Sequence, residues 1–321
     1  MEFEKMVAKL KDVAKLAGVS VTTVSRVINN YGSLSKKTIY KVHQAMQELN
    51  YQPNALARAM QGKPSNFIGL IFPNLTNPFY AELVNELESR LFAKGYKTII
   101  ASAAENEQIE HEYLGMLMAN QVDGIISGSH NLGIEEYKQV GAPIVSFDRY
   151  LAEGIPIVTS DSYSGGRLAA DYLVNWGCQN LAVLIDEDTS SSPTINRVQG
   201  VVDYMNEHDF EYTPLDVNEI QVEEVFPGDF DGVLAPDDEF ALQIRSLAER
   251  AGKVFGKDFI VTGYNGSHLV QKIAPDLPTV VRPVDSLADE LIDTLLKRIA
   301  DPTKPLPSKE LPVRLANPLP N

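Results

Sequence analysis

The spacing of apolar and polar residues changes along the chain and divides it into two parts. Between residues 9 and 50, apolar side chains recur every three or four positions, which is typical of short amphipathic helices. From Asn66 onward, short runs rich in β-branched and aromatic residues alternate with helical patterns. Such alternation predicts βαβ units with a parallel sheet. We therefore expect an all-α head followed by a larger α/β body with helices on both faces of its sheets.

The pattern of the head predicts three short helices around one small core. The first helix ends at Gly18, and Ser20 is a suitable N-cap for the second. The apolar stripe of the second helix consists of Val24, Val27 and Ile28. A third helix follows Ser35, with Ile39, Val42, Met46 and Leu49 expected on its buried side. Two short helices joined by a glycine-containing turn form a helix-turn-helix.

The second predicted helix presents side chains that suit DNA. In a helix-turn-helix, this helix enters the major groove and its N-terminal residues reach the base edges. Arg26 can make a bidentate contact to guanine, while Val21 and Thr22 offer apolar contact to a thymine methyl group. The residues that suit phosphate contacts are Ser20, Thr23, Ser25 and Asn29. A small helical bundle with an ordinary polar face is the competing interpretation.

The distribution of charge favours the DNA-binding interpretation. The 321-residue chain has a net charge of -15, yet residues 1–64 hold 10 Lys and Arg against 4 Asp and Glu. This part therefore carries +6, and the remainder carries -21. A basic head on an acidic body indicates that only the head meets a polyanion.

Other features of the sequence exclude several classes of protein. No apolar run approaches the roughly 18 residues that span a bilayer, and the first residues lack the apolar core of a secretory signal. We expect a cytoplasmic protein with no membrane partner. Cys178 is the single cysteine, so an internal disulfide is excluded and a buried, unreactive thiol is expected. Met6 begins a segment as plausible as the one that begins at Met1.

The body contains two sets of predicted strands, which indicate two lobes with a cleft between them. The first set covers 67–72, 97–102, 123–128, 143–148 and 155–161, and the second covers 180–186, 230–238 and 259–265. Helices are expected near 164–177, 194–208, 239–251 and 266–274. Ligands of such sheets bind beyond the carboxyl ends of the strands. The polar residues found there are Asp148, Asp161, Asp186, Asp237 and Asn265.

Catalytic interpretations of these residues have little support. The chain has no GxSxG elbow, no P-loop and no GxGxxG after its first strand. Asp237 and Asp238 are adjacent carboxylates, but no third metal ligand follows at motif spacing. Loop-tip Asp, Asn, Arg and Ser side chains supply the fixed donors and acceptors that a polyol needs. We expect a binding protein rather than an enzyme, without a cofactor or a metal.

Two segments carry a resemblance to a known family. "LKDVAKLAGVSVTTVSRVINN" and "YQPNALARAM" resemble the DNA-binding head and hinge of the lactose-repressor/galactose-repressor family, whose signature DVAxxAGVSxxTVSRVxN is matched from Asp12 to Asn29. The resemblance implies a helix-turn-helix domain over 1–52, a hinge helix over 53–63 and a two-lobed effector-binding and dimerisation domain over 64–321. The N-lobe would hold residues 66–160 plus a C-terminal segment, and the C-lobe residues 162–282. The family pattern also adds Leu10 to the DNA-contacting residues.

The hinge sequence "PNALARAM" is too short for a stable isolated helix, since helices below roughly 12–15 residues are marginal in water. Proteins of the resembling kind insert apolar wedges into the minor groove, and Met60 stands at the wedge position. The residues that would face the groove walls and backbone are Asn54, Ala57, Arg58 and Gln61. We expect residues 53–61 to be disordered without DNA and helical on the operator.

The resemblance also extends to the body, which is similar to periplasmic sugar-binding proteins. The residues it places at the effector are Asn77, Phe79, Ser127, His130, Asp148, Arg149, Thr194, Arg197, Asp237 and Asn265. Asn265 stands where the family usually has Asp, and it can donate as well as accept a hydrogen bond. A phosphorylated effector would require cations, and Arg149 and Arg197 are the available candidates.

Segments such as "PIVSFDR" look most similar to the sucrose-operon repressors of Gram-positive bacteria. The resemblance therefore implies a homodimeric repressor that binds a palindromic double-stranded operator and is released by a sugar or sugar phosphate. Three alternatives stay open: a regulator whose sugar or purine ligand is a corepressor, a non-regulatory sugar-binding protein, and an enzyme with a fused DNA-binding head. A phosphoprotein co-regulator is compatible with the body but is not indicated by any residue.

Overall fold

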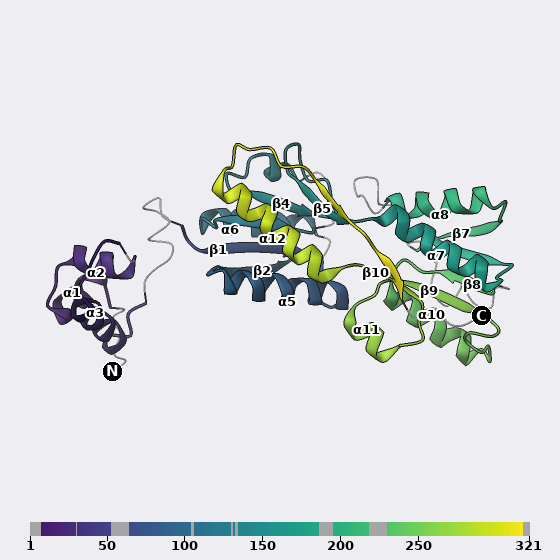
Figure 1. The fold of residues 1–321 in the computed structure, drawn as a ribbon, viewed down its shortest axis with the longest axis horizontal. Coiled ribbons are helices and arrows are strands. Elements are labelled where there is room, and N and C mark those ends of the chain that lie inside the picture. The colour runs from purple at the N-terminus through teal and green to yellow at the C-terminus, as the bar shows by residue number, and fades with distance from the viewer. Residues whose placement is uncertain are drawn as a thin grey trace. The chain divides into compact units, whose positions relative to one another are not determined.

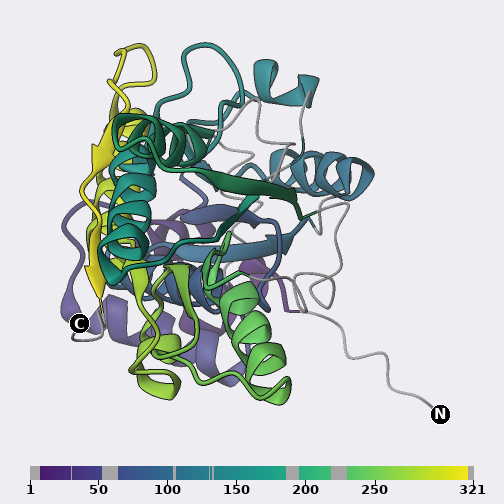
Figure 2. The same ribbon diagram turned by 90° about the vertical axis from the view of Figure 1, so that its right-hand side faces the viewer.

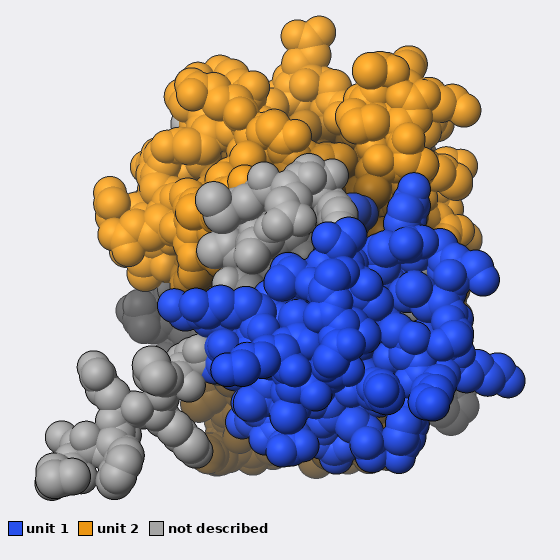
Figure 3. Space-filling view, turned by 90° about the vertical axis from the view of Figure 1, so that its left-hand side faces the viewer, with its two compact units in different colours: residues 1–65 blue, residues 66–321 orange. Residues whose placement is uncertain are grey.

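The computed structural model describes residues 8–29, 31–52, 64–103, 106–129, 131, 134–185, 195–217 and 230–316. The chain divides into two compact units, Met1–Ser65 and Asn66–Asn321, which have different colours in Figure 3. The expected hinge helix, with Asn54, Ala57, Arg58, Met60 and Gln61, lies outside the described residues. Its folding on the operator therefore stays a prediction.

The first unit contains the three helices expected for the head. They are α1 (Leu10–Ala17), α2 (Val21–Ile28) and α3 (Lys36–Glu48). Gly18 ends α1 in a left-handed conformation with φ 65°, and the Ser20 hydroxyl accepts the Thr23 N–H to cap α2. Val24 and Val42 are fully buried in the core that the helices share.

The expectation that Ile39 is buried was wrong. Its side chain is 36% exposed, whereas Val42, one turn later in α3, is fully buried. Three short helices enclose only a small apolar volume, and the buried part of α3 begins at Val42. The apolar periodicity predicts the face of α3 on which Ile39 lies, but it does not show at which residue the buried core ends.

The N-lobe of the second unit is a six-stranded parallel sheet with helices on both faces. Its strand order is β11 (Lys309–Leu311), β5 (Ile157–Ser160), β4 (Ile144–Phe147), β3 (Gly124–Ser127), β1 (Phe67–Phe72) and β2 (Lys97–Ser102). The helices are α5 (Pro78–Ala93), α6 (Glu107–Ala119), the 3-10 helix η1 (Glu135–Lys138) and α12 (Val284–Ala300). Apolar residues of α5 and α12 share one core with the sheet, and α6 packs in a second core.

The C-lobe repeats this arrangement with one antiparallel strand. Its strand order is β12 (Arg314–Ala316), β10 (Thr279–Val281), β9 (Ile260–Asn265), β8 (Gly232–Leu234), β6 (Leu181–Ile185) and β7 (Tyr212–Asp216). The helices α7 (Ser162–Trp176) and α8 (Ile195–Glu207) cover one face, while α10 (Asp238–Arg250) and α11 (His268–Ile273) cover the other. The predicted fold class, an all-α head and two α/β lobes with helices on both sheet faces, is confirmed.

The chain passes between the two lobes three times. It leaves the N-lobe after β5, returns from β10 to α12, and crosses again from β11 to β12, as the yellow C-terminal segment in Figures 1 and 2 shows. Strands β7, β10, β11 and β12 were not anticipated from the sequence. Each has only three to five residues, too few for a clear period of two.

Two further sequence expectations can be compared with the fold. Cys178 is 1% exposed, so the burial expected for it is confirmed, and burial raises the pKa of its thiol to about 12, which disfavours the reactive thiolate. Within the described ranges, no helix combines the length and the apolarity needed to cross a membrane.

Helices α7 and α8 lie side by side (Figure 1) and approach each other through two glycines. A Cβ atom on Gly166 would lie 2.0 Å from the Arg197 carbonyl oxygen, and one on Gly200 would lie 2.2 Å from the Tyr163 carbonyl oxygen. Both contacts are with backbone atoms, which cannot rotate away. The close crossing therefore requires glycine at both positions, and it fixes the backbone of α8 at Arg197.

We expect Gly166→Ala to lower the free energy of unfolding by about 1–3 kcal/mol, because the two helices must separate to admit the methyl group. The matched control is Gly115→Ala in the middle of α6, where a Cβ meets no atom within 4 Å. That change should stabilise the protein by about 0.5–1 kcal/mol. Urea denaturation measures both effects, and an equal response of the two variants would contradict this account.

Candidate DNA-binding surface and ligand pocket

The exposed face of α2 carries the residues expected at base edges. Val21 is 45% exposed, and Thr22 and Arg26 are also exposed, whereas Val24 and Val27 point into the core. The helix therefore presents one short row of mixed apolar, hydroxyl and cationic side chains. Such a row suits the major groove, which offers thymine methyl groups and guanine acceptors.

Arg26 is positioned by the turn after α2. Its Nε donates to the Tyr31 carbonyl oxygen at 3.4 Å, and a Cβ on Gly32 would come within 2.4 Å of its Nη2 atom. The guanidinium thus rests on this turn, close to Gly32. Since the bond to Tyr31 is long, little free energy is lost when Arg26 turns toward another acceptor.

The remaining head residues proposed for DNA contact are partly engaged within the head itself. The Ser20 and Thr23 hydroxyls lie 2.8 Å apart, and Asn29 Nδ2 donates to the Ser25 carbonyl oxygen at 2.6 Å. Leu10 packs against the head core and is half-buried. These side chains therefore contribute to the structure of the head itself.

In the N-lobe, the loop after β1 and the start of α5 carry two of the proposed effector residues. Asn77 is the N-cap of α5, and its Oδ1 accepts the Phe79 N–H at 3.0 Å. Phe79 is 1% exposed and stacks on Phe147 with ring centroids 6.1 Å apart. Asn77 therefore uses one polar atom for the helix cap, while the Phe79 ring belongs to the apolar floor.

A buried ion pair lies beside that floor. Asp148, just after β4, pairs with Arg282, which follows β10 at the passage from the C-lobe to the N-lobe. Asp148 also accepts the Thr159 hydroxyl at 2.8 Å, and Arg282 Nε donates to Ser160 Oγ at 2.8 Å. Arg282 lies 4.4 Å above the Phe79 ring centroid. The carboxylate expected to accept a sugar hydroxyl is thus already bound to a cation.

The end of β3 contains a second buried polar cluster. Ser127 Oγ lies 2.7 Å from the Tyr137 hydroxyl, which donates to Glu110 at 2.5 Å. Glu110 is fully buried and also accepts from Ser129 and Asn131. Ser127 therefore holds the loop after β3 in place rather than standing free for a ligand. His130 and Thr194, proposed for the effector, lie outside the described residues, as does Asp186.

In the C-lobe, Arg197 and Asp237 are neighbours. Arg197 Nη1 donates to the Pro236 carbonyl oxygen at 2.7 Å, and its guanidinium lies 4.3 Å above the Tyr264 ring centroid. Asp237 is the N-cap of α10 and accepts the Phe240 N–H at 2.9 Å. Burial raises the pKa of Asp237, and the charge of Arg197 opposes that rise.

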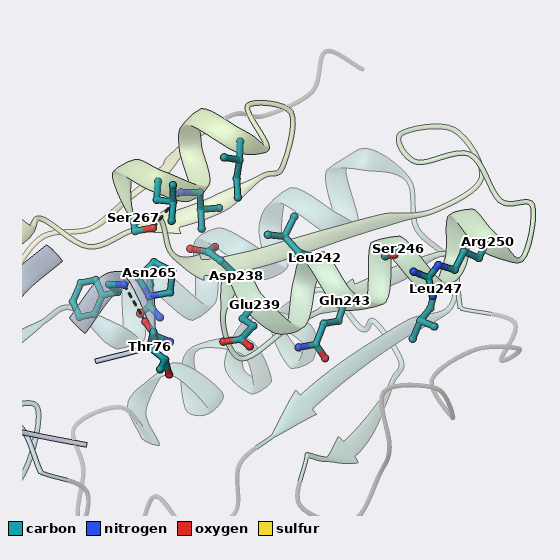
Figure 4. Close-up of a pocket in the computed structure, with 16 residues that line it drawn as sticks. Thr76, Asp238, Glu239, Leu242, Gln243, Ser246, Leu247, Arg250, Asn265 and Ser267 are labelled. Carbon is teal, nitrogen blue, oxygen red and sulfur yellow. Dashed lines mark hydrogen bonds between the residues drawn. The ribbon is translucent and has the colours of Figure 1, made fainter. Parts of the chain in front are cut away.

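A cavity of about 540 Å³ brings residues of both lobes together (Figure 4). The N-lobe contributes Thr76 to Phe79, and the C-lobe contributes side chains of α10, α11 and the end of β9. Asn77, Phe79 and Asn265 are the predicted effector residues that line it. Asn265 has a positive φ of 93°, a conformation in which asparagine is among the favoured residues.

Other predicted residues gather around the phenol of Tyr80, next to Phe79. Burial raises the pKa of Tyr80, the charges of Asp148 and Asp237 add to the rise, and Arg149 and Arg282 oppose it. Groups from both lobes therefore act on the same buried hydroxyl. Asn77, Phe79 and Asn265 line the cavity. The other described effector residues, Ser127, Asp148, Arg149, Arg197 and Asp237, are not part of its lining, and several are already bonded to other parts of the protein.

Asp238, on the wall of the cavity, is 5% exposed and bridges two loops of the C-lobe. It accepts the Gly266 N–H at 2.8 Å and the Thr279 hydroxyl at 2.5 Å. Burial raises the pKa of Asp238 to about 7, since the two donors offset the loss of solvation only in part.

This shift predicts a pH-dependent stability. The folded-state pKa lies above the value of about 3.9 in an unfolded chain, so the folded protein binds the proton more tightly. The resulting stabilisation is complete below about pH 4 and is lost as the pH rises through about 7, at up to about 1.4 kcal/mol per pH unit. Asp238→Asn should remove this component, because the amide cannot ionise and the Thr279 hydroxyl can rotate to accept from it.

Urea denaturation between pH 5 and pH 8 measures the difference. Glu239→Gln, which neutralises the exposed neighbouring carboxylate, is the matched control and should keep the wild-type slope. An unchanged slope in Asp238→Asn would contradict the raised pKa.

Comparison with known proteins identifies the family. Residues 9–54 match the bacterial regulatory proteins of the lacI family, and residues 65–284 match the periplasmic binding proteins and sugar binding domain of the LacI family. The chain belongs to the LacI family.

LacI-family relatives match over nearly the whole chain. The chain is 46% identical to a sucrose operon repressor of Pediococcus pentosaceus, over 97% of this chain and 98% of that protein. It is 32% identical to a ribose operon repressor of Bacillus subtilis, over 90% and 91% of the two chains. The structure of a lac repressor dimer bound to operator and the anti-inducer ONPF has a TM-score of 0.81 and 26% identity, and covers 96% of this chain and 97% of its own. The family assignment made from Asp12–Asn29 is confirmed, and these relatives are transcriptional repressors rather than enzymes.

Sequence reasoning missed Arg282, whose side chain contacts Asp148, Ser160 and Phe79 in this LacI-family body. It stands in "VVRPVDS" without any motif, and no local pattern indicates that it reaches the other lobe. A buried arginine after an apolar strand could have served as a signal, because a cation at such a position requires a partner.

Proposed function

We propose that this protein represses a sugar-utilisation operon by binding a pseudo-palindromic operator, and that a sugar or sugar derivative held between its lobes releases it. The observation that carries the proposal is the exposed row on α2, set on a basic head and followed by a two-lobed body with buried Arg and Asp side chains. The sucrose operon repressors among its relatives support sucrose or a related fructoside as the class of effector.

The DNA-binding step depends on a few side chains of each head. With α2 in the major groove, Val21 and Thr22 contact thymine methyl groups, and Arg26 leaves the Tyr31 carbonyl to pair with a guanine. Ser25 and the cap residues Ser20 and Thr23 lie close to the phosphates. Two such heads read the two halves of a palindrome, which requires a homodimer with two-fold symmetry.

Effector binding acts on the operator through the arrangement of the lobes. Asn77 belongs to the N-lobe, whereas Arg197 and Asn265 belong to the C-lobe. A ligand that contacts all three side chains therefore favours one arrangement of the lobes. For release, the ligand must bind more tightly to the lobe arrangement that cannot hold the operator than to the arrangement that can. The segment 53–63, which joins head and body, transmits the change by folding on the operator or unfolding from it. A ligand with the opposite preference would be a corepressor.

We expect Arg26→Ala to weaken binding to an operator selected in vitro by about 5- to 150-fold, because a bidentate guanine contact provides about 1–3 kcal/mol. Arg26→Lys is the control: it keeps the charge, and so the affinity for random DNA, and retains at most part of the guanine contact. Gel shifts with operator and random DNA measure this. A full preference for the operator over random DNA in Arg26→Ala would contradict the guanine contact.

The same gel shifts, with and without sucrose, fructose and their phosphates, test the regulatory step. Release by at least one of these ligands supports the proposal. Tighter operator binding in the presence of the ligand would replace the inducer with a corepressor. Insensitivity to all of them would remove the sugar-responsive function.

The proposed homodimer offers a surface for a second test. Leu269 and Ile273 on α11 are 53% and 64% exposed, and both belong to the lining of the cavity. Large apolar side chains exposed together mark contact surfaces. We infer that a second copy of the chain covers them.

Ile273→Glu combined with Leu269→Glu should raise the dissociation constant of the dimer at least tenfold, since two carboxylates would lose water in the interface. Val254→Glu changes another exposed apolar side chain, which is 51% exposed, and should leave the dimer intact. Sedimentation velocity distinguishes the two results. A dimer of unchanged strength in the α11 variant would place the interface elsewhere.

A further inference from the structure

A second cavity is lined by the N-lobe alone. Its volume is about 790 Å³, and it shares no lining residue with the cavity described above. The lining comes from η1, the segments 140–144 and 150–155, the last turn of α12 and the residues that follow it. Ala142 and Ile144 lie at the amino end of β4, whereas Asp148 follows the carboxyl end of that strand. The cavity is therefore separate from the effector residues at the strand ends.

The cavity exists because β4 and β5 are joined without a helix. Parallel neighbours are usually connected by a dozen or more residues, which form a helix that covers the sheet. Here only the nine residues 148–156 join the two strands, and they contain no helix. On the α6 side of the sheet, this loop and the four-residue η1 provide the cover. Such a thin cover leaves space that side chains do not fill.

The walls of the cavity are mainly aliphatic. The apolar lining residues that also belong to the core beneath α6 are Val140, Ile144, Leu151, Ala152 and Ile155. An apolar wall releases water when an apolar group covers it. The volume lies within the range of roughly 300–1,000 Å³ that is typical of small-molecule sites. The cavity thus suits the apolar part of a compact organic molecule.

One cation of the lining lacks a partner. Arg298 is half-buried in the last turn of α12, and its Nε is buried without a hydrogen-bond partner. No hydrogen bond or ion pair joins its side chain to another residue in the described part of the chain. The helix dipole favours a cation in the last turn, but it leaves the donors of the guanidinium unpaired. Because an unpaired buried donor costs free energy, a ligand that supplies an acceptor is favoured.

The charges of the lining do not attract an anion by their sum. Lys138 and Glu153 line the cavity with opposite signs, and both are exposed. Lys138 is also paired with Glu135 at 2.8 Å, so these three charges and Arg298 add to zero. What distinguishes Arg298 is its burial, because water and salt screen exposed charges more strongly than a half-buried one.

We propose that this cavity is a second ligand site, which binds a small organic anion with an apolar body through Arg298. The anionic group is a carboxylate or a phosphate, since the parallel N–H donors of a guanidinium match both. The apolar body covers the aliphatic wall beside Ile144. The inference goes beyond the proposed function and does not depend on the ligand between the lobes.

Isothermal titration of the full-length protein tests the ligand class. Phenyl phosphate is compared with phenol, benzoate with benzyl alcohol, and both anions with inorganic phosphate. At least one of the two organic anions should bind tenfold or more tightly than its neutral counterpart, which leaves Arg298 unpaired. Inorganic phosphate should bind more weakly than phenyl phosphate, because it lacks the apolar body. Equal affinities within both pairs, or no binding of either organic anion at millimolar concentrations, would overturn the inference.

Amide hydrogen exchange locates the bound anion. Protection should appear in residues 137–144 and 150–155, which line the second cavity, and not in α10 and α11, which line the cavity between the lobes. Protection of α10 and α11 alone would place the anion between the lobes and refute the second site.

Variants of α12 connect the binding to Arg298. Arg298→Gln should weaken the binding of the organic anion at least fivefold, while Arg298→Lys keeps the charge and should retain part of the affinity. The matched control is Lys297→Gln, which removes an exposed cation from the same turn and should keep the full affinity. An unchanged affinity in Arg298→Gln contradicts the role of the guanidinium.

A second variant keeps the site testable if the loss of Arg298 disturbs the end of α12. Ala142 is half-buried in the lining, so the ring in Ala142→Phe would occupy the space of the apolar body. This variant should weaken anion binding at least fivefold, and operator binding in gel shifts should stay unchanged, which shows that the protein is folded. Full anion affinity in Ala142→Phe would show that the anion binds elsewhere.

Discussion

The buried pair of Asp148 and Arg282 fixes the point at which the chain returns from the C-lobe to the N-lobe. Arg282 stands where the chain returns from β10 to α12, and its contacts with Asp148, Ser160 and Phe79 all lie in the N-lobe. Breaking such a pair by removing one partner costs about 3–5 kcal/mol, because the other charge remains buried. The passage between the lobes is therefore anchored at one point. A movement of the lobes that displaces Arg282 has to disrupt this pair.

Close packing of α7 against α8 fixes the position of Arg197 in the C-lobe. Gly166 of α7 lies against the Arg197 carbonyl oxygen, and Gly200, one turn later in α8, lies against α7. A helix crossing this close leaves the backbone of Arg197 little freedom. Its side chain is then positioned by the Pro236 carbonyl and the Tyr264 ring. The packing of α7 against α8 thus sets the geometry of Arg197.

How much the sequence could predict differs between the parts of the molecule. The head was predictable because its signals are local: Gly18 ends one helix, Ser20 caps the next, and Val24 and Val27 repeat at helical spacing. The strand-end residues Asp148, Asp237 and Asn265 were found because a parallel sheet places strand ends at one edge. The contacts of Arg282 and the occupied state of Asp148 depend on pairs more than a hundred residues apart, and strand β12 depends on its pairing with β10 across more than thirty residues. No local sequence pattern predicts such contacts. The exposure of Ile39 could not be predicted from a local pattern either.

The lobes also meet away from Arg282, where the His268 N–H at the start of α11 donates to Glu82 of α5 at 2.9 Å. Since Glu82 is on the N-lobe and His268 on the C-lobe, this bond holds only in the lobe arrangement seen here. An effector that favours a different arrangement must offset its loss, which for a hydrogen bond to a charged group is about 1.5–3 kcal/mol. An effector that favours this arrangement keeps the hydrogen bond and has no such loss to offset. The free energy by which a ligand changes operator affinity is then the difference between its contacts in the two arrangements. A ligand held by one lobe alone would bind both arrangements equally, so a switch requires contacts with both lobes.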